Sequence, residues 1–207
     1  MNINILEFIS KGGIVMYPLL MITFLAFTFS FDRYFALRRN RSFKGLIDKV
    51  RELLKEGKFE EAEQLVANKN GAIPRLLEKG IYYIHHEESL VEDRLKELIY
   101  EEMIDLEKHL PTISTFAGLM TLMGLLGAVT GMISVFNDIA MVGTGDAQAV
   151  ARGLSEVLVS TQTGLAAAIP TLYFHNHLSI MVDQIVLDLK RTATMLIFMS
   201  RLHKQKG

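Results

Sequence analysis

The sequence of 207 residues has no cysteine, which excludes disulfide bonds and thiol-based catalysis but leaves the redox compartment open. It also lacks an excess of basic residues, because 22 Lys and Arg are balanced by 23 Asp and Glu. Nucleic acid is therefore not expected as a partner. The alternation of polar and apolar residues that is typical of β-strands is missing throughout, so the expected fold is all-α.

Residue sets that could carry chemistry are also missing. No combination of Ser, His and Asp and no pair of carboxylates indicates catalysis, so the protein is not expected to be an enzyme. His175 and His177 would point about 200° apart on a helix, and they are not expected to share a metal ion. The glycines of residues 124–131 lack the following Lys-Ser or Lys-Thr of a phosphate loop. Neither a metal site nor a cofactor is predicted.

Charged residues are concentrated in one part of the chain. Of the 45 charged residues (22 basic and 23 acidic), 30 lie between Ala36 and Leu110, and long runs outside this block carry almost none. A helix needs about 20 apolar residues to cross a hydrocarbon layer of ~30 Å. The sequence therefore predicts three transmembrane helices, at residues 12–35 and 111–137 and in the apolar run 153–182.

Basic residues cluster after the first and third predicted spans, at residues 38–44 and 190–206, whereas the loop at 138–148 has two acidic residues and no basic one. Basic flanks remain on the cytoplasmic side of a membrane. The short N-terminus (residues 1–11) and the loop are thus predicted to lie on the outer side of the membrane, which is the periplasmic side in a bacterial inner membrane. The insert at 36–110 and the tail at 183–207 are predicted to be cytoplasmic.

The insert is expected to be helical. Ser42 can cap a helix that ends at Gly57, and two amphipathic helices should follow, at residues 59–66 and 72–86. A capping box at residues 89–92 begins a further helix. No breaker follows it before Pro111, so one long helix is predicted to continue into the second span with a bend at that proline.

Glu156 is the charged residue inside the third apolar run. A carboxylate in hydrocarbon costs roughly 2.5–3.5 kcal/mol on insertion scales, which makes it a functional candidate by default. Arg152 precedes it by four positions, so the two could form an ion pair on one helix face. Equally, both could be interfacial residues at the outer end of the span.

Small and polar residues in the second and third spans predict close helix packing. Gly127 and Gly131 form a small-xxx-small pair beside Gly124, and such spacing lets helix backbones approach each other. In the third span, the four polar residues 160–163 surround the helix, so at least one side must face protein or water. Together these features predict a homo-oligomer with a polar seam.

Two stretches resemble a known signature: GLLGAVTGMI at residues 124–133 and ARGLSEVLVSTQTGLAAAIP at residues 151–170. The pair resembles the MotA/TolQ/ExbB proton channel family, and the resemblance extends over the whole chain. Three spans and a short tail favour the ExbB/TolQ-like branch over the four-span flagellar stators.

The resemblance implies a bacterial inner-membrane protein that forms a pentamer, with the second and third spans lining a central pore. An ExbD/TolR-like partner with one span and an essential aspartate would occupy this pore, and a TonB/TolA-like protein would reach across the periplasm. The complex would use the proton motive force for transport, envelope integrity or motility.

The resemblance also implies roles for single residues. Thr161 matches the pore threonine of the third helix, Glu156 the intramembrane glutamate, and Pro170 the proline near the cytoplasmic end, and Gly164 lies in the small-residue run between them. It places the start of the third helix near Ala147, which gives a third span at residues 149–182 and puts Glu156 deeper than composition suggests. Because Glu156 and Thr161 lie about 140° apart on a helix, we assign Thr161 to the pore and Glu156, with Arg152, to the interface between subunits.

One position departs from the family pattern. The second pore threonine of the family aligns with Ala128, and Thr130, two positions on, should face another side of the helix. This departure favours an alternative function, a non-conducting oligomeric membrane scaffold for envelope partners. Glu156 and the hydroxyl groups would suit protons or sodium ions.

Overall fold

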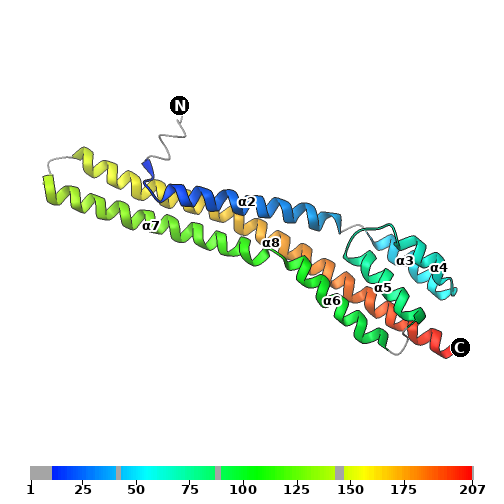
Figure 1. Cartoon of the computed structure of the whole chain (residues 1–207). Helices are drawn as coiled ribbons and strands as arrows, with labels where there is room; N and C mark the ends of the chain where they lie inside the picture. Colours follow the sequence, from blue (N-terminus) through cyan, green and yellow to red (C-terminus); the bar gives the residue numbers. More distant parts are fainter. Residues whose placement is uncertain (1–10, 41–42, 87–89, 143–146, 207) are drawn as a thin grey trace. The chain divides into compact units, whose positions relative to one another are not determined.

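The computed structural model describes residues 11–40, 43–86, 90–142 and 147–206. Within these ranges the regular elements are helices (Figure 1). They are α2 (Met16–Arg39), α3 (Lys44–Lys55), α4 (Phe59–Val66), α5 (Ala72–His86), α6 (Val91–Glu107), α7 (Leu110–Val142) and α8 (Ala147–Lys206).

Three segments are long and apolar enough to cross a membrane, and they lie in α2, in residues 91–141 and in α8. The predicted all-α membrane fold is therefore confirmed. The predicted caps at Ser42 and Ser89 lie outside the described residues, as do most of the N-terminal segment and the tip of the 138–148 loop.

The chain divides into two compact units. We call residues 11–32 and 109–177 the membrane unit, and residues 33–108 and 178–206 the polar unit; α2 and α8 contribute residues to both. Each unit is described by itself below.

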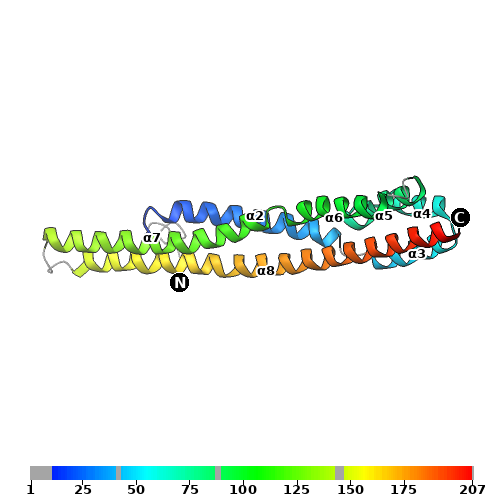
Figure 2. The ribbon, with the colours of Figure 1, turned by 90° about the horizontal axis from the view of Figure 1, so that it is seen from below.

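In the membrane unit, α2 packs against α7 and α8 through small and flexible side chains. Ala26, Met120 and Ala168 form a buried cluster, one residue from each helix. The α7 helix and the first part of α8 run side by side in both ribbon views (Figures 1 and 2). Large apolar side chains such as Leu122 and Phe136 stay exposed on α7, as expected for a surface that lipid or another chain covers.

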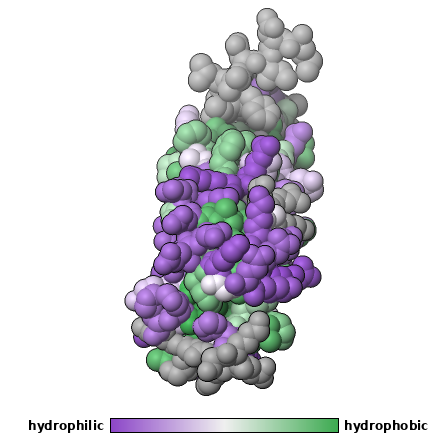
Figure 3. Space-filling view, turned by 90° about the vertical axis from the view of Figure 1, so that its right-hand side faces the viewer, coloured by the Kyte–Doolittle hydropathy of each residue, from purple (hydrophilic) through white to green (hydrophobic). Residues whose placement is uncertain are grey.

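The polar unit combines α3 to α6 with the second part of α8. Its core contains Leu77, Leu95 and Leu196, and the face seen in Figure 3 is largely hydrophilic, with apolar patches between the polar side chains. Glu102, only 9% exposed, accepts a hydrogen bond of 2.6 Å from Arg75, so its charge is paired. The predicted positions of α3, α4 and α5 are confirmed, and Gly57 ends the first of them with a φ of +77°.

The junction between α6 and α7 differs from the prediction of one long helix bent at Pro111. The first helix ends at Glu107, and His109 adopts a φ of +67° before α7 begins. A proline in a helix interior removes a hydrogen bond and clashes with the carbonyl four residues earlier, at a cost of ~3 kcal/mol. The chain avoids this because Pro111 lies in the first turn of α7, where its missing N–H is not needed.

Candidate functional site

The α7–α8 contact in the membrane unit is built on glycine. A Cβ added to Gly164 would lie 2.7 Å from the carbonyl oxygen of Met120 and 2.9 Å from the Cα of Gly124, so the backbones touch. Gly127 faces Ser160 in the same way, since a Cβ on it would lie 2.5 Å from the Ser160 Cβ. Further along, Gly131 faces Val157 and Gly153 faces Val135. We call this contact the glycine seam.

The glycine seam lies within one chain. From the sequence, the same glycines and the polar residues 160–163 predicted contacts between copies. Ser160 is fully buried against Gly127 and donates a hydrogen bond to the carbonyl of Val157 at 3.2 Å. At least one of the four polar residues 160–163 therefore has its hydrogen bond and its packing partner without a neighbouring subunit.

Thr161 lies at the edge of the glycine seam and is half-buried. Its hydroxyl donates a hydrogen bond of 2.8 Å to the carbonyl of Val157 and lies 3.4 Å from the carbonyl oxygen of Gly124. A threonine hydroxyl that donates to its own helix is inexpensive in an apolar environment. Its oxygen can still accept a hydrogen bond, from water or from a protonated carboxyl group.

Ala128 and Thr130 lie on α7, and both are half-buried. The Thr130 hydroxyl donates to the carbonyl of Gly127 at 3.0 Å. Within the described part of the chain it forms no hydrogen bond to α8. Because the two positions differ by about 200° around the helix, the hydroxyl of Thr130 does not take the place of the one missing at Ala128.

Glu156 is half-buried, and its carboxylate packs against Gly13, just before α2. Gly13 has a φ of +73°, and a Cβ at this position would overlap the Glu156 carboxylate. A cavity of about 580 Å³ adjoins the carboxylate, and Lys11, Asp138 and Arg152 line it. Arg152 and Glu156 share this cavity, but among the described residues no ion pair joins them.

The contact with Glu156 makes Gly13 a testable position. Gly13→Ala should push the carboxylate aside and strain the backbone by about 1–2 kcal/mol, because φ is left-handed. We expect a lower melting temperature of the purified chain, with partial recovery in Gly13→Ala/Glu156→Asp, whose acid is shorter. Gly118→Ala is the matched control, since a Cβ there has nothing within 4 Å. An unchanged melting temperature for Gly13→Ala would contradict the contact.

Pro170 lies inside α8 and is half-buried, and the helix continues through it. The next residue, Thr171, donates a hydrogen bond of 2.8 Å to the carbonyl of Ala167. In the described part of the chain no group of three His, Asp or Glu residues is arranged to hold a metal ion.

Sequence reasoning missed the roles of Gly13 and Ser160. Ser160 and Gly164 form a small-xxx-small pair on α8 that matches the one on α7, and this signal was available in the sequence. Nothing in the sequence indicates that Gly13 and Glu156, far apart in the chain, lie together.

Comparison with known proteins places this arrangement in a family. Residues 68–191, which contain the glycine seam from α7 and α8, match the MotA/TolQ/ExbB proton channel family. ExbB-like protein 1 of Synechocystis sp. is 28% identical over 175 residues, covering 80% of this chain and 67% of that protein. ExbB-like protein 3 of the same organism is 29% identical over 202 residues, or 94% of each chain.

The Tol-Pal system protein TolQ of Haemophilus influenzae is 36% identical over 87 residues. This match covers 42% of the present chain and 38% of TolQ. The chain thus spans nearly the full length of one relative, about two thirds of another and less than half of the third.

Proposed function

Since this multi-pass membrane protein belongs to the MotA/TolQ/ExbB proton channel family, with an ExbB/TolQ-like sequence, we propose that it is the channel-forming subunit of a proton-driven motor complex. It would act without catalysing a reaction, as one copy in a homo-oligomer, a pentamer by analogy with the family. An ExbD/TolR-like protein with one span and a membrane aspartate would lie in the central pore. A TonB/TolA-like protein would carry the motion across the periplasm.

The observation that carries this proposal is the hydroxyl of Thr161 at the edge of the glycine seam. Moving a proton through a low-dielectric passage is costly unless fixed polar groups or water accept it on the way. The Thr161 oxygen can accept a hydrogen bond from the protonated aspartate of the partner, and it can hold a water molecule when that aspartate is charged. Exposed apolar side chains on α7 and α8 would face lipid or neighbouring copies.

The proposed location is the bacterial inner membrane, with the N-terminus in the periplasm and the C-terminus in the cytoplasm. The basic residues that end α2, Arg38 and Arg39, support this orientation, as do Lys190 and Arg191 in the polar unit. Glu156 and the cavity beside it would then lie toward the periplasmic side of the membrane unit.

The proposal is tested by purifying the chain with the single-span protein that accompanies it and reconstituting both into vesicles. A potassium diffusion potential, negative inside, should drive proton uptake, which a trapped pH dye reports. Vesicles that hold the chain alone should show none. Uptake of sodium instead of protons would mean that the motor is driven by sodium ions. Uptake of neither ion would favour the scaffold function over the motor.

A further inference from the structure

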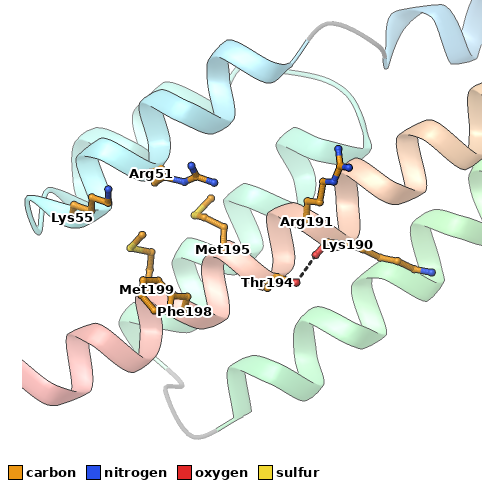
Figure 4. Close-up of a pocket in the computed structure, with 8 residues that line it drawn as sticks. All are labelled: Arg51, Lys55, Lys190, Arg191, Thr194, Met195, Phe198 and Met199. Carbon is orange, nitrogen blue, oxygen red and sulfur yellow. Dashed lines mark hydrogen bonds between the residues drawn. The ribbon is translucent and has the colours of Figure 1, made fainter.

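The polar unit contains a groove with basic rims and an apolar floor (Figure 4). It measures about 710 Å³ and lies between α3 and α8. Two cations, Arg51 and Lys55, come from α3, and α8 supplies the other six residues, which are Lys190, Arg191, Thr194, Met195, Phe198 and Met199. We call this the basic groove.

The basic groove is not filled by the rest of the chain. Phe198 is 57% exposed, and the side chain of Arg191 is 69% exposed, with only a loose ion pair of 3.6 Å to Asp188. The opposite face of α8 is buried by the polar unit, through Leu189 and Leu196. This part of α8 therefore has a second face, apolar and basic, that lacks a covering element within the described residues.

A complementary surface lies on α6. Its inner face, including Leu95, Leu98 and Leu106, is buried. On its outer face, Tyr100 is 67% exposed and Ile104 is 73% exposed, although both are large and apolar. Two exposed acids, Glu97 and Glu101, flank them at helical spacing. We call these four residues the acidic ridge.

We propose that the acidic ridge of one copy docks in the basic groove of the next copy. The inference rests on the proposed homo-oligomer. The two surfaces are complementary in charge and in hydrophobicity. The acids of the ridge meet the basic rims of the groove, and Tyr100 and Ile104 meet its apolar floor around Phe198. Groove and ridge are different surfaces of the same chain, so the contact is head-to-tail, and such contacts form rings when the rotation closes.

Cysteine cross-linking tests this contact directly, since the natural chain has no cysteine to interfere. Ile104→Cys and Thr194→Cys in one chain should give, on mild oxidation, a ladder of covalent oligomers. When two differently tagged chains each carry one of these substitutions, the disulfide should join the two tags. Tyr82→Cys with Thr194→Cys is the matched control, because Tyr82 is exposed on α5 outside the ridge and should not cross-link.

Charge reversal provides the second arm. Glu101→Lys should lower the yield of the Ile104–Thr194 cross-link about tenfold, and adding Arg51→Glu should restore it. If native mass measurement shows an intact homo-oligomer but no cross-link forms, the proposed docking is wrong while the proposed function stands. Binding of acidic-lipid vesicles by the groove, in place of the cross-link, would likewise overturn it. A chain that is monomeric throughout would overturn the docking and the homo-oligomer together.

Discussion

Thr161→Val should abolish motor function while leaving the homo-oligomer at its native mass. The substitution keeps the branched shape of the side chain and removes the hydroxyl that donates to Val157. The hydroxyl oxygen is also proposed to hold the water that passes the proton on, and a hydrogen bond to that charged group contributes about 1.5–3 kcal/mol, so its loss should slow proton transfer roughly 10- to 150-fold. The effect on folding should be small, because the hydroxyl interacts only with the carbonyls of Val157 and Gly124, and both belong to helices that keep their backbone hydrogen bonds.

The matched control is Thr163→Val. Thr163 is also half-buried in α8, and its hydroxyl donates to the carbonyl of Val159 at 2.7 Å. It lies about 200° around the helix from Thr161, so it should not face the same passage. We expect Thr163→Val to complement a deletion strain nearly as well as the natural protein.

For each variant, complementation of the deletion strain, the native mass of the purified protein and proton uptake in vesicles should all be measured. Uptake slowed roughly 10- to 150-fold, with an unchanged mass, is the expected result for Thr161→Val. Glu156→Ala is expected to differ, because it removes the carboxylate that packs against Gly13 and should impair both assembly and function. If Thr161→Val supports full function, the assignment of Thr161 to the pore is wrong, and this result would favour the scaffold function.

Local sequence signals predicted the helices of this protein well. The three apolar runs and the start of α5 at Ala72 follow from hydrophobicity, periodicity and chain-breaking residues, which act over a few positions. The break before α7 shows where such signals are too coarse. Pro111 predicted a disturbance, but its ring is harmless in a first turn, and the helix is interrupted just before it, where His109 has a positive φ.

Contacts between distant segments could not be read in the same way. Glycine spacing predicted close packing, yet it does not say whether the partner helix belongs to the same chain. The structure shows that Gly124 and Gly164 meet within one chain. The contact of Gly13 with Glu156 is even harder to predict, since it depends on where the start of α2 lies beside α8. No local sequence pattern encodes that position.

Gly164→Leu should prevent the chain from folding, and this expectation follows from the glycine seam. The nearest neighbours of an added Cβ are backbone atoms, the carbonyl oxygen of Met120 at 2.7 Å and the Cα of Gly124 at 2.9 Å. Backbone atoms cannot turn aside as a flexible side chain can, so α7 and α8 would have to separate. Even Gly164→Ala should cost about 1–3 kcal/mol, the usual range for overpacking.

Two controls separate this effect from a general intolerance of larger residues. Gly118→Leu on α7 should be accepted, because a Cβ there meets nothing within 4 Å. Gly80→Ala should cost less than Gly164→Ala, since the added Cβ meets the side-chain ends of Leu196 and Leu95. The measurements are the amount of chain in the membrane and its melting temperature in mild detergent. Because the seam lies within one chain, Gly164→Leu should lower both even where no oligomer forms; a folded, stable monomer of this variant would show that the glycines serve contacts between copies instead.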